Sequence, residues 1–156
     1  MPIPSNRVFI VSPNWQTGGV ERTNIQWRKC LELADKEVIF VTCNSKEYVD
    51  VNTSGFWDMN KWIIRNLKVK DTLVLVQTWY LWRLLPVLLF IAVNRTKLIL
   101  SERNTWSQYT GYSRLRRLWI QMWIRLFKSL SSQIIVNSAS IRNSNRIYRN
   151  SLVFNN

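Results

Sequence analysis

The stretch R-V-F-I-V-S-P-N-W-Q-T-G-G-V-E-R-T, from Arg7 to Thr23, decides the fold of this chain. Its first part, Arg7–Ser12, is a short apolar run that stops at Pro13, as a buried parallel strand does. The pair Gly18–Gly19 then precedes a segment with apolar residues at near-heptad spacing, which is typical of an amphipathic helix. A strand, a glycine turn and a helix make half of a βαβ unit, so the stretch predicts a parallel sheet.

Further apolar runs alternate with helical patterns along the rest of the chain. The expected strands are Arg7–Ser12, Glu37–Cys43, Thr72–Gln77, Lys97–Leu100, Gln133–Val136 and Leu152–Phe154. The expected helices are Val20–Ala34, Gly55–Val69, Trp79–Val93, Tyr112–Leu130 and Ser138–Ile147, with Asn44–Ser54 as a loop. The alternation predicts one α/β domain over residues 1–156, a Rossmann-like, doubly wound parallel sheet of about six strands.

The chain is strongly basic, and its charge is uneven. Its net charge is +13, and all nine Asp and Glu residues lie in residues 1–102. The charged side chains of residues 103–156 are therefore all basic. A field of one sign attracts polyanions, whether nucleic acid, an anionic membrane surface or a phosphorylated substrate.

Several functional classes are excluded by what the chain lacks. It has no histidine and only two cysteines, Cys30 and Cys43, in no metal-binding pattern, so we expect neither a metal site nor a cofactor. A hydrolase with a histidine-containing triad is excluded for the same reason. The apolar run Val8–Val11 is too short for a signal peptide, so we expect reduced thiols and a cytoplasmic protein. The run Leu84–Val93 contains Pro86 and is too short to span a bilayer, so we expect a buried helix.

The segment Ser12–Thr23 lies where an open α/β sheet binds ligands, after a strand and at the start of a helix. Paired glycines let the backbone approach a ligand, and the free N–H groups of a helix start favour an anion. Neither a dinucleotide-binding fingerprint nor a P-loop is present. The alternative is that Gly18–Gly19 is a turn required only for close packing.

The order of short motifs resembles that of bacterial family 4 glycosyltransferases of the GT-B type. The matching pieces are G-G-V-E-R after the first strand, L-S-E-R-N-T at Leu100–Thr105, Q-I-I-V-N-S at Gln133–Ser138 and L-V-F-N-N at Leu152–Asn156. Together they cover nearly the whole chain in the order of the family's N-terminal, acceptor-side domain. The resemblance implies a role in polysaccharide biosynthesis at a membrane.

The resemblance also implies which residues form the site. Those implied for substrate binding are Gly18, Gly19, Glu21, Arg22, Asn104 and Ser138, and those implied for catalysis are Glu102 and Arg103. Many relatives have a histidine near Glu102, whereas this chain has none. Arg103 would replace it only electrostatically, because a guanidinium stays protonated at neutral pH. The alternative is that Glu102 and Arg103 merely form ion pairs with each other or with neighbours.

The donor-binding half of the family is missing from this sequence. In the family, the second domain binds the nucleotide sugar through a Glu-x7-Glu pattern, and no carboxylate follows Glu102 here. We therefore expect the C-terminal donor-binding domain to be absent. The chain would be a fragment, a truncated product, or a subunit completed by a separate donor-binding chain.

The predicted helix Tyr112–Leu130 combines a basic stripe with aromatic residues. At 100° per residue the stripe contains Arg114, Arg117, Gln121, Arg125 and Lys128, and the opposite side contains Trp119, Trp123 and Phe127. Such a helix suits the surface of an anionic membrane. Core packing of the apolar positions below a solvated charged face would give the same pattern.

Three hypotheses for the function follow. The first is the acceptor-side half of a glycosyltransferase that acts on a membrane-associated or lipid-linked glycan at the inner face of the membrane. The second is a non-catalytic binding subunit or remnant at that surface. We rank a nucleic-acid-binding domain last, because no nucleic-acid-binding signature accompanies the basic segment.

Overall fold

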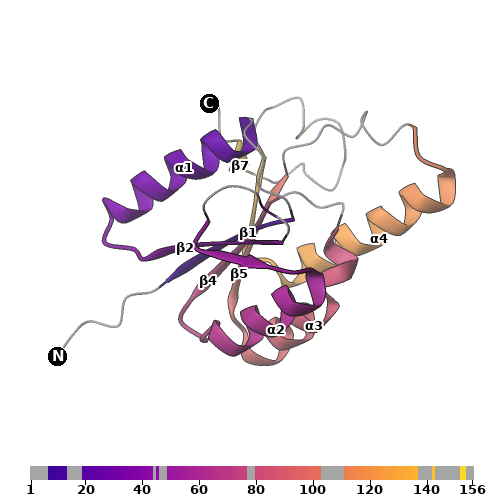
Figure 1. The fold of residues 1–156 in the computed structure, drawn as a ribbon. Helices are drawn as coiled ribbons and strands as arrows, with labels where there is room; N and C mark the ends of the chain where they lie inside the picture. Colours follow the sequence, from indigo (N-terminus) through magenta and orange to yellow (C-terminus); the bar gives the residue numbers. More distant parts are fainter. Residues whose placement is uncertain are drawn as a thin grey trace.

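The computed structural model describes residues 7–13, 19–43, 45, 49–76, 80–102, 111–136, 142 and 152–153. These residues form a parallel seven-stranded sheet with helices on both faces (Figure 1). The strands are β1 (Val8–Ser12), β2 (Val38–Cys43), β3 (Val51–Thr53), β4 (Thr72–Val76), β5 (Lys97–Glu102), β6 (Gln133–Val136) and β7 (Leu152–Val153). The helices are α1 (Gly19–Glu32), α2 (Phe56–Asn66), α3 (Leu85–Asn94) and α4 (Arg114–Leu130), with a 3₁₀ turn, η1, at Leu81–Leu84.

The sheet order is β3-β2-β1-β4-β5-β6-β7, and every neighbouring pair is parallel. The order reverses between β1 and β4, which is the topological switch point of a doubly wound sheet. Six strands lie where the sequence predicts them, to within two residues at either end. The fold class predicted from the sequence is therefore confirmed.

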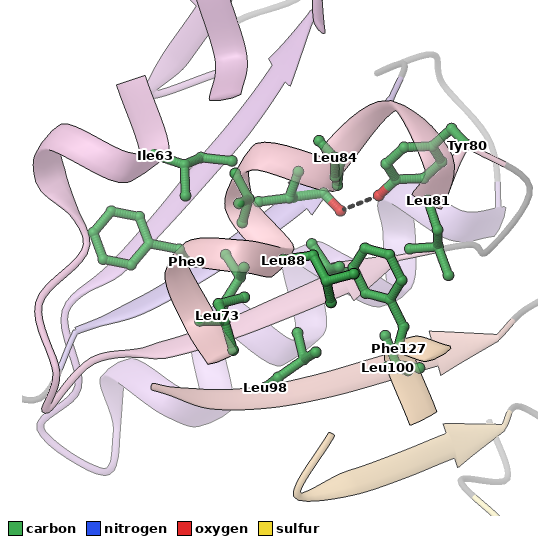
Figure 2. Packing of buried hydrophobic residues seen from close by; sticks show 14 of the residues in the cluster. Phe9, Ile63, Leu73, Tyr80, Leu81, Leu84, Leu88, Leu98, Leu100 and Phe127 are labelled. Carbon is green, nitrogen blue, oxygen red and sulfur yellow. Dashed lines mark hydrogen bonds between the residues drawn. The ribbon is translucent and has the colours of Figure 1, made fainter. Parts of the chain in front are cut away.

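The main core lies between the sheet and α2, η1, α3 and α4. Alternate residues of the central strands, including Phe9, Leu73 and Leu98, point into it and contact Ile63 and Phe127 (Figure 2). Figure 1 shows α1 on the other side of the sheet, where it covers a smaller cluster. Both faces of the central strands are buried, which accounts for their nearly continuous apolar runs.

At the amino edge of the sheet, one buried carboxylate connects the start of β1 with the residues before β4. Asp71 is almost fully buried and accepts hydrogen bonds from the backbone N–H groups of Arg7 and Lys68. The Arg7 guanidinium forms an ion pair with Asp71 at 2.8 Å and also donates to the Asn66 carbonyl. These bonds join the start of β1 to the segment that leads into β4.

Two predicted elements differ from the structure. Asn44–Ser54, expected to be a loop, contains the edge strand β3, which is short and only partly buried, so no apolar run marks it. The predicted helix Trp79–Val93 is divided into η1 and α3, and Pro86 lies in the first turn of α3, where its missing N–H costs nothing. The predicted helix Ser138–Ile147 lies outside the described residues apart from Arg142, which is helical.

The expectation that Leu84–Val93 is a buried helix is also wrong in part. Val87, Leu88 and Ile91 are buried, but Leu89 and Val93 are exposed, Val93 to 81%. The sequence is apolar on all sides of α3, so periodicity gives no indication of which side faces water.

Candidate functional site

The candidate site lies at the carboxyl edge of the sheet, where the strands end and helices begin. Ser12, Cys43 and Glu102 are the last residues of β1, β2 and β5. Gly19 starts α1 at the same edge, and Gly55 precedes α2 there. Ligands of open α/β sheets bind at this edge, and the switch point between β1 and β4 lies at its centre.

A buried carboxylate forms part of this edge. The Glu102 side chain is 0% exposed, and the residue is level with Val136 of β6. A carboxylate rarely occupies such a position without a structural or chemical role, because its charge loses hydration when it is buried. Glu102 is also close enough to Tyr80 to contribute to the raised pKa of that phenol.

Tyr80 connects the carboxyl ends of β1 and β4. Its ring is fully buried, and its hydroxyl lies 3.1 Å from the Val11 carbonyl oxygen and 3.0 Å from that of Val76. The dashed line in Figure 2 ends at this hydroxyl. Burial raises the pKa of Tyr80 well above its usual value, and repulsion from Cys43, once this thiol is deprotonated, and from Glu102 raises it further. Tyr80 therefore remains a neutral hydrogen-bond donor, which connects β1 to β4 at the switch point.

Cys43 lies on the same edge as a protonated thiol. Its Sγ–H donates to the Pro13 carbonyl at 3.0 Å. Burial raises the pKa of this thiol, and the positive charge of Arg83 opposes that effect. The Arg83 guanidinium itself lies 4.8 Å from the Phe56 ring centroid and 4.9 Å from that of Trp82. A protonated, buried thiol is a poor nucleophile, so the position of Cys43 indicates a structural role.

Two hydroxyls near this edge form no hydrogen bond with the described residues. Thr42 Oγ1 and Ser101 Oγ are both buried, and both residues are next to last in their strands. They lie on the face that carries α1, because the adjacent residues Val41 and Leu100 point into the core on the other face. Buried polar atoms without partners are uncommon, and at a ligand-binding edge they indicate groups that a ligand can contact.

The structure brings some of the sequence-predicted residues to this edge. Gly19 begins α1, Glu21 is in its first turn, and Arg22 is exposed just after them. Glu102 ends β5 and is buried. The other predicted site residues, Gly18, Arg103, Asn104 and Ser138, lie outside the described residues.

The basic helix α4 has one apolar side buried against the core and a second apolar side exposed to solvent. Ile120, Ile124 and Phe127 are buried against the core, and Ser113 Oγ caps the helix by accepting from the Arg116 N–H. Five further apolar side chains of α4 are exposed: Leu115, Leu118, Trp119, Met122 and Leu126. Three of the predicted membrane-facing residues, Arg114, Trp119 and Arg125, are exposed. The other three, Arg117, Trp123 and Lys128, are half-buried.

The core-packing alternative for α4 therefore holds only for part of its apolar surface. Trp119 is 48% exposed, and its ring contacts that of Trp123 at 5.6 Å between centroids. Arg116 is also exposed, and its guanidinium lies over the Tyr112 ring, 3.9 Å from the ring centroid. An exposed apolar stripe beside a basic stripe indicates a surface that binds a partner.

Tyr80, Cys43 and Arg83 were missed as site residues by the sequence analysis. Tyr80 contacts Val11, which is 69 positions away, so no local pattern points to it.

No helix of the described residues is long and apolar enough to cross a membrane. Within the same residues, no three potential metal ligands gather in one place.

No protein family model matches the sequence, and no curated protein matches it. Solved structures do match the fold. An alpha-glucosyltransferase in complex with UDP and a 13-mer DNA containing a central A:G mismatch aligns with a TM-score of 0.61 and 12% identity, over 94% of this chain. The same kind of enzyme, with UDP and a 13-mer DNA containing an HMU base, aligns with a TM-score of 0.60 and 13% identity, over 97% of this chain.

A third neighbour, an alpha-glucosyltransferase in complex with UDP, aligns with a TM-score of 0.56 and 12% identity over 85% of this chain. The chain spans 35 to 42% of the length of these three proteins. At this identity the likeness establishes the fold, which is that of a Rossmann-like half of a GT-B glycosyltransferase. Because two of these neighbours are complexes with DNA, they give no support for ranking nucleic acid as the least favoured partner.

Proposed function

We propose that this chain is the acceptor-side, N-terminal half of a GT-B glycosyltransferase of the family 4 type, and that a donor-binding half completes it. The observation that carries the proposal is the buried Glu102 carboxylate at the carboxyl edge of a sheet with this fold. The order of the motifs G-G-V-E-R, L-S-E-R-N-T, Q-I-I-V-N-S and L-V-F-N-N supports the same assignment.

Glu102 has the position and chemistry to bind an acceptor hydroxyl. A carboxylate at the carboxyl edge of the sheet would accept a hydrogen bond from that hydroxyl and orient its oxygen toward the sugar donor. It would also receive the hydroxyl proton as the acceptor oxygen bonds to the anomeric carbon of the donor sugar. The bond from that carbon to the nucleotide phosphate breaks in the same reaction, and the nucleotide leaves with the electron pair. The free N–H groups at the start of α1 and the unpaired hydroxyls of Thr42 and Ser101 would contact polar groups of the bound substrates.

We also propose that α4 places this site at an anionic membrane surface, at the inner face of the membrane. The exposed stripe from Leu115 to Leu126 would enter the headgroup region, and the adjacent Arg114, Arg117, Arg125 and Lys128 would contact anionic lipids. A lipid-linked or membrane-bound glycan would then be within reach of the carboxyl edge.

DNA is the second candidate acceptor. It is favoured by the basic stripe of α4 and by the DNA present in two of the matched structures. Basic side chains on one stripe would contact phosphates whatever the polyanion is. The apolar residues beside the stripe favour the membrane, because a phosphate backbone offers them no apolar partner.

The test of the proposed function is a transfer assay with both halves present. The chain, or its Glu102→Gln variant, is mixed with the protein encoded by the next reading frame and a panel of radiolabelled nucleotide sugars. The acceptors are a membrane lipid extract and duplex DNA. Loss of the carboxylate should lower transfer by about 10²-fold or more, because general-base catalysis contributes at least that much.

Glu32→Gln is the matched control, since Glu32 is an exposed carboxylate whose ion pair with Arg28 contributes little. Full activity of the Glu102→Gln variant would contradict the catalytic role. If neither wild type nor variant transfers sugar in the presence of a donor-binding partner, the chain is a non-catalytic subunit or remnant instead.

A further inference from the structure

The Arg83 guanidinium is held against two aromatic rings at the carboxyl edge of the sheet. It lies 4.8 Å from the ring centroid of Phe56, the first residue of α2, and 4.9 Å from that of Trp82, its neighbour in η1. Both contacts stabilise the cation through the negative face of a ring. They also restrict the long arginine side chain, so its position is largely defined before a ligand binds.

The backbone around Arg83 is fixed as well. The buried Asn60 side chain donates from Nδ2 to the carbonyl oxygens of Arg83 and Phe56, at 2.8 and 2.7 Å. The Arg83 N–H donates to the Tyr80 carbonyl at 2.8 Å, and the Tyr80 hydroxyl is bound to the ends of β1 and β4. The first turn of α2, η1 and the switch point of the sheet are therefore one connected unit.

The donors of this guanidinium are available to a ligand. The aromatic rings contact the faces of the planar group, whereas its N–H bonds lie in the plane. Arg83 is exposed, and among the described residues its side chain has no hydrogen bond and no ion pair with a carboxylate. Asp58, in the first turn of α2, instead accepts from the Ser54 hydroxyl. A planar cation with in-plane donors matches the oxygens of a phosphate, which it binds through two parallel hydrogen bonds.

An exposed apolar stripe begins beside the guanidinium. Trp82, Leu85 and Leu89 are spaced i, i+3 and i+7 along η1 and α3, so they lie on one side of this helical segment. All three are exposed, whereas Leu84 and Leu88 are buried on the other side. Trp82 belongs to both features, because its ring also contacts the guanidinium. A cation at the end of an apolar stripe fits a ligand that has an anionic head and an apolar chain.

Arg83 lies at the same edge of the sheet as the buried Glu102 carboxylate. It is on the side of β2, because its positive charge opposes the raised pKa of the thiol of Cys43, the last residue of that strand. β2 and β5, which ends in Glu102, are separated by β1 and β4, so about 14 Å lies between their ends. A molecule that contacts both residues therefore has its anionic group some distance from the group bound at Glu102.

We propose that Arg83 binds the phosphate of a lipid-linked acceptor. The stripe formed by Trp82, Leu85 and Leu89 would contact the first part of its lipid chain. The inference rests on the proposed function, in which the acceptor glycan meets Glu102. The sugar, the phosphate and the lipid would then lie in this order from Glu102 to Leu89. Nucleic acid is the less suitable occupant, because its phosphodiester backbone has no apolar part to contact the stripe.

The test is a titration of the whole chain with geranyl diphosphate, a soluble molecule with a diphosphate and a short lipid chain. Because the basic stripe of α4 also attracts phosphate, the readout has to be local. It is the fluorine NMR resonance of Trp82 in the chain labelled with fluorotryptophan, assigned by its loss in Trp82→Phe. Geranyl diphosphate should move this resonance at a lower concentration than inorganic pyrophosphate or geraniol does, because each of these lacks one of the two parts.

Substitution of Arg83 is the specific test. Arg83→Gln should weaken the binding of geranyl diphosphate about 10-fold or more, as expected for lost hydrogen bonds to a charged group. Arg83→Lys should recover only part of the affinity, since an ammonium is not planar and cannot form two parallel bonds. The matched control is Arg65→Gln, which removes an exposed arginine from the other end of α2 and should leave the affinity unchanged. The other tryptophan resonances report whether each variant is folded.

Three results would overturn the proposal. One is equal affinity of the wild type and Arg83→Gln. Another is a response to geraniol as strong as that to geranyl diphosphate. The third is no response to geranyl diphosphate, and if duplex DNA then moves the Trp82 resonance, Arg83 belongs to a nucleic-acid site. No sugar donor enters the experiment, so its failure leaves the Glu102→Gln transfer assay to decide the proposed function.

Discussion

Tyr80 joins the two halves of the sheet through a single hydroxyl. Because the hydroxyl lies between the Val11 and Val76 carbonyls in a buried place, Tyr80→Phe should lower the free energy of unfolding by about 1–2 kcal/mol. Urea unfolding followed by tryptophan fluorescence measures this change. The slope of the transition should stay the same, and a variant as stable as wild type would show that the two carbonyls find other donors.

The raised pKa of Tyr80 should also make the free energy of unfolding decrease at alkaline pH. Its folded-state pKa is raised, so the stabilisation is complete below the unfolded pKa of about 10 and decreases as pH rises toward the folded pKa. The stability difference between wild type and Tyr80→Phe should therefore be smaller at pH 10.5 than at pH 8, by about 0.8 kcal/mol. Urea unfolding at the two pH values measures it, and a constant difference would contradict the raised pKa.

The two cysteines should differ sharply in reactivity. Cys30 is exposed, whereas Cys43 is buried, donates to the Pro13 carbonyl and has a raised pKa. Because the thiolate is the reacting form, a thiol reagent at pH 8 should label Cys30 rapidly and Cys43 only after unfolding. Mass spectrometry of the labelled chain counts the sites. The Cys30→Ser variant is the control, and rapid labelling of that variant in the folded state would mean that Cys43 is accessible.

At the scale of elements, the proposed contact between α4 and an anionic membrane can be tested by substitution. The four predicted contacts of α4, Arg114, Arg117, Arg125 and Lys128, are each worth roughly 1 kcal/mol near an anionic surface. Changing all four to Gln should weaken vesicle binding by at least 10²-fold, and binding of the wild type should decrease with salt. Sedimentation with vesicles of increasing anionic lipid content measures the effect.

The matched control for α4 changes Lys29, Arg65, Lys68 and Lys70 to Gln. These residues are exposed, and the control removes the same net charge elsewhere. Equal losses in the two variants would indicate a dependence on net charge alone. Tighter binding to duplex DNA than to vesicles at equal ionic strength would favour the nucleic-acid acceptor.

The elements that the sequence predicts best are those with the strongest burial. β1 and β4 lie at the centre of the sheet, and their apolar runs follow directly from that position. β3 has three residues at an edge, so it is too short and too polar to be distinguished from a loop. The exposed side of α3 could not be predicted, because which side faces water depends on where α2 and α4 pack.

At the scale of the whole molecule, the proposed function predicts that residues 1–156 by themselves bind no sugar donor. Because the donor site of a GT-B enzyme lies in the other half, isothermal titration calorimetry with UDP-glucose should detect no binding tighter than about 1 mM. The same titration after addition of the donor-binding half is the positive control. Micromolar binding by residues 1–156 alone would contradict the assignment of this chain to the acceptor side.

Of the candidate site, the sequence predicts the location better than the residues. The sequence predicts that Gly19 and Glu102 lie at one edge of the sheet, because each follows a predicted strand, and the structure has both at that edge. Tyr80 and Cys43 could not be assigned, since their contacts depend on the pairing of β1 with β2 and β4. Such pairing is a property of the complete sheet.

The pairing of β1 with β4 also has a consequence during synthesis. Val8 pairs with Thr72, and about 64 further residues must be translated before the pair can form. At a translation rate of about 5–20 residues per second, synthesis of these residues takes roughly 3 to 13 s. The other partner of β1, β2, is synthesised earlier. The nascent chain therefore has a period in which the unpaired side of β1 is open to chaperones or to other nascent chains.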